Sequence, residues 1–174
     1  MRHNNSFVSE VLAALGDAAN MLPRPFESPY RWVRRASGIP YRRYYNTVHH
    51  MQRRGLLRIN RQKGKKFIHL THKGHLEALF SRAALVKSSH WDGKWRMVLF
   101  DIPEAAHSTR DQIRKFLKRI GFIKLQASVF ISPYALNREA VEYLRKSQLL
   151  DYIRIVRVDE MDDDHLLRLS FKVN

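Results

Sequence analysis

The second half of the chain alternates strand-like and helix-like segments, and this order restricts the fold more than any other feature. Residues 95–100 and 152–158 carry the apolar character and alternation of strands, and residues 167–173 predict a last strand. Residues 121–134 supply one long strand or two short ones, centred on Ser128–Ser132. Helix-like segments follow the first strand and the middle one, which predicts an α+β fold with one sheet covered by two helices.

The two helix-like segments have recognisable starts and apolar faces. Ser108, with Asp111 three residues later, predicts an N-cap, and Asn137 predicts another. Gly121 ends the first of these helices. The side chains expected to face the sheet are Ile113, Phe116, Leu117 and Ile120 in the first helix and Val141, Leu144 and Leu149 in the second. The resulting βαββαβ order predicts a ferredoxin-like domain over residues 89–174.

Charge is distributed very unevenly between the two halves. The net charge is +16, and residues 1–90 carry 17 Lys and Arg against four Asp and Glu, whereas residues 91–174 carry 15 against 12. A basic excess confined to one half predicts a polyanionic partner for that half, and a merely basic surface is the alternative.

Composition excludes several classes of protein. The chain has no cysteine, which excludes disulfides, cysteine-ligated zinc and cysteine nucleophiles and fits a reducing compartment. No apolar run approaches the roughly 20 residues that a membrane span needs, and the first residues lack the apolar core of a signal peptide. We therefore expect a cytoplasmic protein that does not engage a membrane.

The first half predicts three short helices. The first covers Ser6–Ala19, and prolines 23 and 25 end it. Ser28-Pro29 predicts the start of a second helix, which stops at Gly38 with Trp32, Val33 and Ala36 inward. A third runs from Tyr41 to Arg54 and is closed by Gly55. The last two helices form a candidate helix-turn-helix.

The helix over residues 41–54 predicts a DNA-recognition element. Tyr44, Val48 and Met51 share one face at i, i+4 and i+7 and should be buried. No acid occurs between Ser28 and Leu76, although a plain exposed basic helix is the alternative. Arginine, amide and phenol groups are those that contact bases and phosphates. The side chains expected to face outward are Tyr41, Arg42, Arg43, Tyr45, Asn46, His49, His50 and Arg53.

Two strand-like segments follow, at residues 56–59 and 66–70, and predict a β-hairpin. The residues between them form a basic tip, which would lie along the phosphate backbone. The tip cations are Arg61, Lys63, Lys65 and Lys66. Thr71 should cap a further helix with Leu76, Leu79, Phe80 and Ala83 on its apolar face.

The order of these elements resembles that of winged-helix regulators. In such proteins the wing often leaves through a Leu-Thr-x-Lys-Gly stretch, which Leu70-Thr71-His72-Lys73-Gly74 matches, and Arg54-Gly55-Leu56-Leu57 matches the usual step from helix to wing. The resemblance implies a winged helix-turn-helix domain over residues 1–88, ending at the polar stretch Lys87–His90.

The spacing His69-x-x-His72-x-x-His75 raises the alternative of a metal site. The three histidines straddle a strand end and a helix start, and the nearest acid is Glu77. Because such positions need not converge, we favour polar or phosphate contacts over metal ligation.

An acidic run, Asp159–Asp164, holds five acids in six residues between two predicted strands. A solvated loop is the favoured interpretation. The alternatives are a surface that repels DNA and orients a dimer, or a patch that docks a basic groove in a partner subunit.

The stretch Trp91–Glu104 (WDGKWRMVLFDIPE) resembles the start of the central domain of PaaX-type repressors, and Gly121-Phe122 with Leu125–Tyr134 (LQASVFISPY) fits the same domain. That family represses phenylacetate catabolism genes, so the resemblance implies a transcriptional repressor, with a small-molecule effector left open. PaaX-type repressors usually continue into a further helical domain, whereas this sequence ends at Asn174.

The same domain is similar to Cas-two, the small CRISPR-adaptation protein that dimerises between two integrase dimers. Some of its relatives cut nucleic acid with a metal held by paired aspartates after the first strand, and the matching residue here is Asp101. Two Asp101 carboxylates across a dimer axis would hold one Mg²⁺ or Mn²⁺. Glu104 and Asp92 are candidate second acids. The alternative role for Asp101 is to cap the following turn.

The sequence therefore predicts a homodimeric, sequence-specific binder of double-stranded DNA that represses transcription and needs no cofactor. The DNA contacts would come from Tyr41, Arg42, Arg43, Tyr45, Asn46, His49, Arg53, Arg61, Lys63, Lys65 and Lys66. A divalent-metal-dependent endonuclease or CRISPR-adaptation subunit using Asp101 is the alternative.

Overall fold

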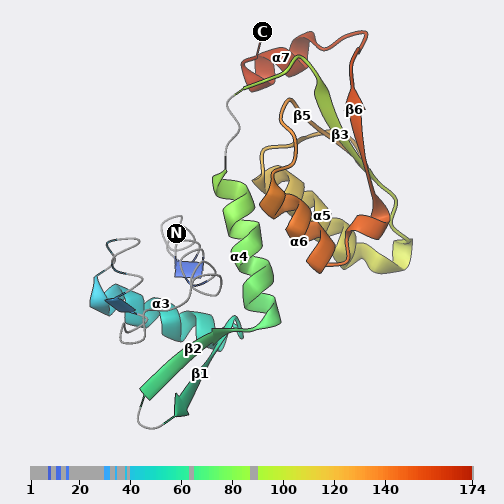
Figure 1. Ribbon diagram of the computed structural model, residues 1–174. Coiled ribbons are helices and arrows are strands. Elements are labelled where there is room, and N and C mark those ends of the chain that lie inside the picture. The colour runs from blue at the N-terminus through green and yellow to red at the C-terminus, as the bar shows by residue number, and fades with distance from the viewer. Residues whose placement is uncertain are drawn as a thin grey trace. The chain divides into compact units, whose positions relative to one another are not determined.

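The computed structural model describes residues 8, 11, 12, 15, 30, 31, 34, 38, 40–62, 65–86 and 90–173 (Figure 1). The chain forms two compact units, Met1–Arg82 (the first unit) and Ala83–Asn174 (the second unit). The sequence pattern places the boundary later, after residue 88. The division at residue 82 falls inside helix α4 (His72–Leu85), which runs through the boundary.

The first unit is built from helices and one hairpin. Helix α3 (Tyr41–Arg53) is followed by strands β1 (Leu57–Gln62) and β2 (Lys65–Leu70), which pair antiparallel, and then by α4. Val8, Val11, Leu12 and Leu15 are helical and buried. They pack in one core with Tyr44, Val48 and Met51 of α3, with Leu56 and Leu57, and with Ala78 of α4.

The predicted limits of α3 are confirmed. Pro40 stands at its N-cap, and Gly55, with a φ of +70°, donates its N–H to the carbonyl of Gln52 and ends it. The predicted helices over 6–19 and 28–38 lie mostly outside the described residues, including Trp32, Val33 and Ala36. Within them, Tyr30, Arg31 and Arg34 are helical.

The second unit has the predicted βαββαβ order. Strand β3 (Trp95–Phe100) leads through the 3₁₀ turn η1 (Glu104–Ala106) into α5 (His107–Arg119). Strands β4 (Ile123–Gln126) and β5 (Val129–Ser132) follow, so the middle segment forms two short strands. Helix α6 (Arg138–Lys146), the 3₁₀ turn η2 (Leu150–Tyr152), β6 (Ile153–Val158) and α7 (His165–Phe171) complete the unit.

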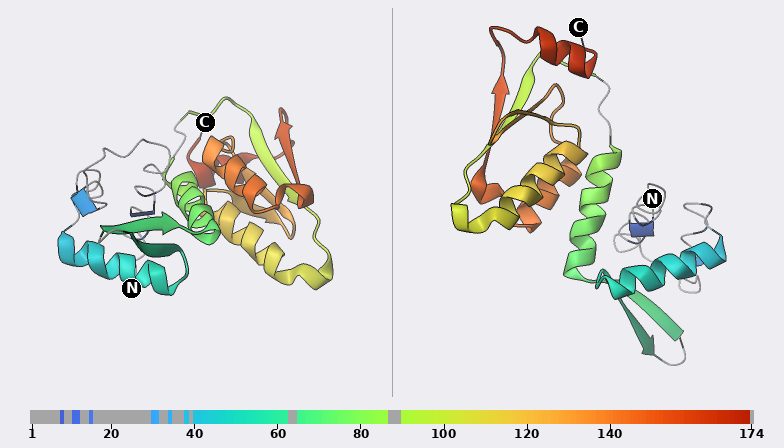
Figure 2. Two further views of the ribbon diagram at one scale, coloured as in Figure 1. Left: turned by 60° about the horizontal axis from the view of Figure 1, so that its bottom comes forward. Right: turned by 180° about the vertical axis from the view of Figure 1, so that it is seen from behind.

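The four strands form one antiparallel sheet in the order β4-β5-β3-β6. Helices α5 and α6 lie side by side on one of its faces (Figures 1 and 2). Phe116 of α5 stacks on Tyr143 of α6 at 4.4 Å between ring centroids, and Phe100 lies 6.0 Å from Phe130 across the sheet. Ile113, Phe116, Leu117 and Leu144 are buried, which confirms the predicted helix faces at these positions.

Two predicted details of this unit are wrong. Residues 167–173 do not form a strand, because residues 165–171 are the helix α7. Ser108 does not cap α5: the chain enters the helix directly from η1, so Ala106 is the N-cap and Ser108 lies in the first turn. Asn137 does cap α6, since its Oδ1 accepts the N–H of Ala140 at 2.8 Å.

Among the described residues, no helix combines the length and the apolar character needed to span a membrane.

Candidate nucleic-acid interface

Helix α3 separates its residues into a buried face and an exposed one, as predicted. Tyr44, Val48 and Met51 are buried beneath it. Because 3.6 residues complete each turn, the remaining positions form a broad outer surface with no acid. The exposed residues of this outer face are Tyr41, Arg42, Arg43, Tyr45, Asn46, His49, His50, Gln52 and Arg53, of which Gln52 was not predicted from the sequence.

A group of tyrosines fixes the start of α3. The ring of Tyr30 meets Tyr41 edge-on at 4.9 Å and lies 5.3 Å from Tyr44, and Tyr41 lies 5.9 Å from Tyr45. Burial, followed by the nearby Tyr41, raises the pKa of the Tyr44 phenol to about 12. Tyr44 therefore stays neutral and acts as a core residue, while Tyr41 and Tyr45 remain more than 45% exposed, at 58% and 49%.

The two strands of the hairpin are longer than predicted. Strand β1 extends to Gln62, which pairs with Lys65, so only residues 63 and 64 join the strands. Arg61 pairs with Lys66, which places two basic positions side by side on the pair before the last. Lys63 lies outside the described residues, as do the side chains of Lys65 and Lys66. Arg58 and Phe67 are also exposed, but neither was predicted from the sequence as a DNA contact. The alternation of Arg58 with Leu57 and Ile59 could have identified Arg58 as outward-facing.

The two motifs that suggest a winged helix, Arg54–Leu57 and Leu70–Gly74, contact each other at the base of the hairpin. The Thr71 hydroxyl donates to the Gly55 carbonyl at 2.7 Å and accepts the N–H of Gly74 at 3.1 Å, so Thr71 caps α4 as predicted. The Thr71 N–H donates to the Leu56 carbonyl at 3.0 Å. Lys73 donates from Nζ to the Arg54 carbonyl at 3.1 Å. This joint fixes the hairpin's base against the end of α3.

The candidate metal positions do not assemble into a ligand cluster. Over the described parts of the chain, no three His, Cys, Asp or Glu side chains are grouped to hold a metal ion, and this applies to His69, His72 and His75. Asp101 is exposed at the end of β3, and its N–H donates to the carbonyl of Tyr152 at 3.1 Å. It does not cap the next turn, because η1 starts after Pro103 without a side-chain cap.

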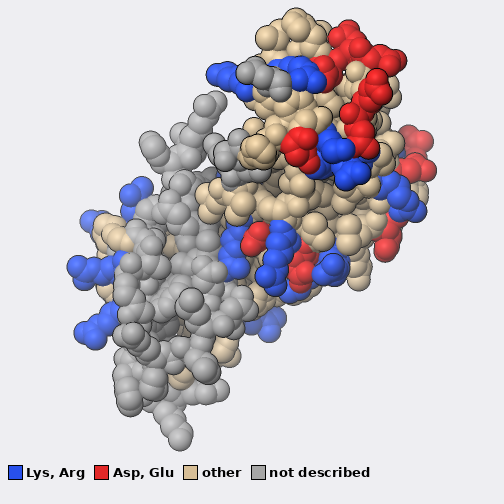
Figure 3. All heavy atoms as spheres, turned by 45° about the horizontal axis from the view of Figure 1, so that its top comes forward, with Lys and Arg blue, Asp and Glu red and all other residues tan. Residues whose placement is uncertain are grey.

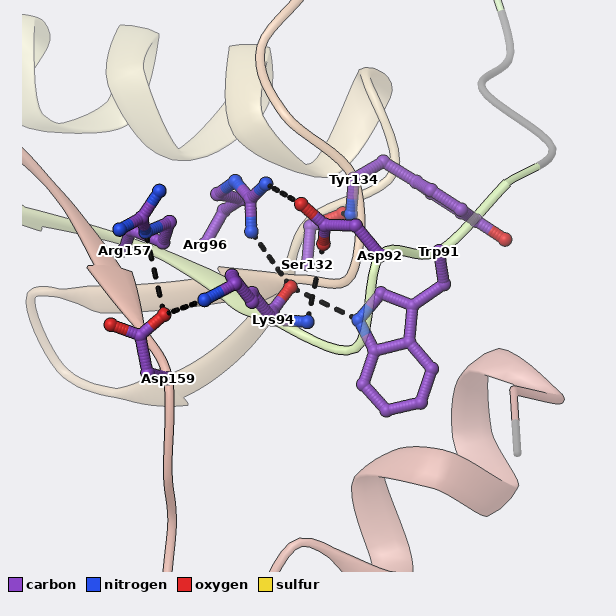
Figure 4. Close-up of polar contacts among 8 residues, drawn as sticks. All are labelled: Trp91, Asp92, Lys94, Arg96, Ser132, Tyr134, Arg157 and Asp159. Carbon is purple, nitrogen blue, oxygen red and sulfur yellow. Dashed lines mark hydrogen bonds and ion pairs between the residues drawn. The ribbon is translucent and has the colours of Figure 1, made fainter.

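The motif Trp91–Arg96 forms a polar network at the start of β3 (Figure 4). Asp92 accepts the Lys94 N–H at 3.2 Å and pairs with Arg96 at 2.5 Å. The Trp91 Nε1 donates to the Lys94 carbonyl at 3.0 Å. Lys94 Nζ pairs with Asp159, which Arg157 also approaches at 3.4 Å. The hydrogen bond from Arg96 lowers the pKa of Asp92, and that from Lys94 lowers the pKa of Asp159.

The acidic run is thus not simply a solvated loop, because both of its ends hold the structure together. Asp164 accepts the indole N–H of Trp95 at 2.9 Å and the Nε–H of Arg168 at 2.7 Å. Arg168, and after it Trp95, lowers the pKa of this carboxyl. Arg168 also lies 4.6 Å over the ring of Trp91, and Phe171 lies 5.8 Å from Trp95. The motif therefore anchors the 159–164 loop and α7, and its role here is structural.

Comparison with known proteins supports the resemblance seen in the motifs. Residues 88–167 match the family model described as the PaaX protein central Cas2-like domain. No curated protein matches the chain. The match spans the four-stranded sheet, both covering helices and the Trp91–Arg96 network. Residues 88–167 therefore form a central Cas2-like domain of the PaaX type.

Proposed function

We propose that the protein is a cytoplasmic transcriptional repressor that binds double-stranded DNA sequence-specifically as a homodimer. The observation that carries this proposal is the outer face of α3, which is basic, aromatic and free of acids over a buried apolar face. The family implies regulation, and the first unit offers the surface that a regulator needs.

In this proposal α3 is the recognition helix of a winged helix-turn-helix and enters the major groove. Arg42, Arg43 and Asn46 would contact base edges, because guanidinium and amide groups form paired hydrogen bonds with guanine and adenine. Tyr41, Tyr45, His49 and Arg53 would contact phosphates and fix the register. The β1–β2 hairpin would be the wing, with Arg61, Lys63, Lys65 and Lys66 along the backbone. The joint at Thr71 supports this arrangement, because it holds the hairpin at a set angle to α3.

A second copy of the chain would cover the sheet face that α5 and α6 leave open. Pairing places Met97, Leu99 and Val156 on this face, opposite the side of Val98 and Phe100. Leu99 and Val156 remain 36% and 42% exposed. Apolar strand residues without a covering layer are typical of subunit interfaces. A two-fold dimer would place two α3 helices on the half-sites of a pseudo-palindromic operator.

Selection of bound duplexes from a random pool tests the DNA-binding role. We expect the wild-type protein to enrich one pseudo-palindromic sequence. Substituting Arg42→Ala with Arg43→Ala should abolish the preference, because each lost base contact costs about 1–3 kcal/mol. Asp101→Ala and the pair Arg145→Ala with Lys146→Ala serve as controls and should keep it. A wild-type protein that enriches no sequence would refute the proposal.

Sedimentation equilibrium tests the homodimer. The wild-type chain should sediment as a dimer, and Val156→Asp should shift it to the monomer, because an uncompensated charge would be buried at the interface. Ile155→Asp is the matched control: Ile155 is 47% exposed on the same edge strand, but its side chain lies on the helix-covered face. A monomeric wild-type protein, or a dimeric Val156→Asp variant, would contradict the assignment of this face.

A further inference from the structure

The second unit also has a basic surface, which its net charge conceals. No acid occurs between Asp111 and Glu139, and this stretch contains Arg114, Lys115, Lys118, Arg119, Lys124 and Arg138. The acids of the unit are concentrated elsewhere, five of them in Asp159–Asp164. A balanced total charge is therefore compatible with two local surfaces of opposite sign.

Four of these cations form the patch that we call the α5–β4 patch, namely Lys115, Lys118, Arg119 and Lys124. Lys115, Lys118 and Arg119 stand at i, i+3 and i+4 on α5, so they share one helix face. The helix ends at residue 119, and β4 begins four residues later. Arg114, one turn before Lys118, donates to the carbonyl of Ala127 at 3.2 Å, which holds this side of α5 beside the turn between β4 and β5.

The direction of Lys124 brings it to the same side of the sheet. Lys124 pairs with Phe130, which is fully buried under the helices, and paired residues of antiparallel strands point to the same face. Strand β4 is an edge strand, so Lys124 stays exposed while it faces the helix layer. The four cations are all exposed.

Seven of the eleven described cations of the unit outside the α5–β4 patch pair with acids. In the described ranges Arg110, Arg138, Arg154 and Lys172 have no ion pair, but they do not share one helix face. Lys94, Arg96 and Arg157 pair with aspartates, and so does Arg168. Arg145 and Lys146 pair with Glu142, and Arg114 with Asp111. None of the four patch residues has an ion-pair partner within the described ranges 40–62, 65–86 and 90–173. Their charge is therefore available to an external anion.

Five of the unit's twelve acids lie beyond the opposite edge of the sheet. The run Asp159–Asp164 follows β6, and the strand order β4-β5-β3-β6 makes β6 and β4 the two edges. Figure 3 shows one group of acidic side chains at the upper right, with further acidic side chains lower down beside basic ones. A surface with cations at one edge and acids at the other fits a polyanion that is attracted at the first edge and repelled from the second.

We propose that the α5–β4 patch contacts the phosphate backbone of double-stranded DNA. The second unit thereby adds its own sequence-independent contact to the one proposed for α3 and the wing. Regularly spaced Lys and Arg on a helix face match the repeated charges of a duplex backbone, and such contacts position a protein without reading bases. This inference rests on the proposed function. The patch is tested by the salt dependence of DNA affinity, whereas the proposed function is tested by sequence preference.

The test is the salt dependence of DNA affinity for the full chain, measured by fluorescence anisotropy with a random-sequence 30-base-pair duplex. The variant combines Lys115→Gln, Lys118→Gln, Arg119→Gln and Lys124→Gln. The matched control combines Arg138→Gln, Arg145→Gln, Lys146→Gln and Lys172→Gln, and it removes the same number of charges. Circular dichroism establishes that both variants are folded.

We expect the slope of log affinity against log salt to fall in magnitude by roughly 2–4 in the patch variant, since each phosphate contact contributes about 0.9. The control should change it by less than about 1. Equal slopes for the patch variant and the wild type, or equal losses in patch variant and control, would overturn the inference. An equal or larger loss with single-stranded RNA of the same length would overturn the assignment to duplex DNA.

Sequence preference separates this inference from the proposed function. The patch variant should prefer the selected operator over random duplex by the same ratio as the wild type, because backbone contacts weaken both equally. If the wild type shows no preference but the slopes differ, the proposed function fails and the patch stands. If preference is present and the slopes agree, the patch alone fails.

Discussion

Replacing Gly74 by alanine should break the hairpin joint and destabilise the first unit by about 3 kcal/mol, the upper end of the usual cost of overpacking. A Cβ added at Gly74 would lie 1.9 Å from the carbonyl oxygen of Leu56 and 3.3 Å from Cδ2 of Leu70. The nearest obstacle is backbone, which cannot rotate away as a side chain can. The same Leu56 carbonyl accepts the N–H of Thr71 at 3.0 Å, so relieving the clash also breaks the joint.

Hydrogen exchange followed by mass spectrometry measures this effect separately for each unit. In Gly74→Ala, peptides covering residues 41–62 and 65–86 should lose protection, whereas peptides covering 95–158 should keep it. Gly55→Ala is the control, because its φ is +70° but its added Cβ meets nothing within 4 Å. That substitution should cost only about 1–2 kcal/mol. Equal protection in Gly74→Ala and the wild type would show that the joint does not hold this unit together.

Sequence patterns predicted the structure correctly wherever a feature depends only on residues within one helix or strand. The buried face of α3 followed from the spacing of Tyr44, Val48 and Met51, because a 3.6-residue period places them in one stripe whatever packs above. The cap at Thr71 and the positive φ at Gly55 are equally local signals. The order of strands and helices in the second unit was predictable for the same reason.

The prediction of a strand over residues 167–173 was wrong because contacts with residues far away in the sequence stabilise a helix there. Leu167, Leu169 and Phe171 alternate with polar residues, which favours a strand, yet the segment is helical. The Asp164–Arg168 pair at i, i+4 and the packing of Phe171 on Trp95 stabilise the helix instead. Trp95 and Asp164 are 69 residues apart, and no local pattern indicates that they meet.

The candidate site shows the same division. The exposed residues of α3 could be listed from sequence, because exposure is the complement of the buried stripe. The α5–β4 patch could not, because its definition depends on which cations find an acid. Lys94 and Asp159 are 65 residues apart in the sequence, so only the fold distinguishes a paired lysine such as Lys94 from an unpaired one such as Lys118.

Replacing Trp95 by alanine should release α7 and destabilise the second unit by about 3–5 kcal/mol. Trp95 is 2% exposed, lies between Trp91 at 5.2 Å and Phe171 at 5.8 Å, and donates its indole N–H to Asp164. Removing the ring leaves a cavity and also removes the hydrogen bond that orients Asp164 toward Arg168. Urea unfolding followed by circular dichroism gives the loss of stability, and hydrogen exchange of residues 160–173 reports the release of α7.

Trp95→Phe separates packing from the hydrogen bond. Phenylalanine keeps an aromatic ring between Trp91 and Phe171 but cannot donate to Asp164, so it should cost about 1.5–3 kcal/mol, the contribution of a hydrogen bond to a charged group. Protection of α7 should then be reduced but not lost. If Trp95→Ala lowers the free energy of unfolding while residues 160–173 keep the exchange protection of the wild type, other contacts hold α7. Such a result would remove the structural role assigned to the Trp91–Arg96 motif, because the motif reaches α7 through this indole and the neighbouring ring of Trp91.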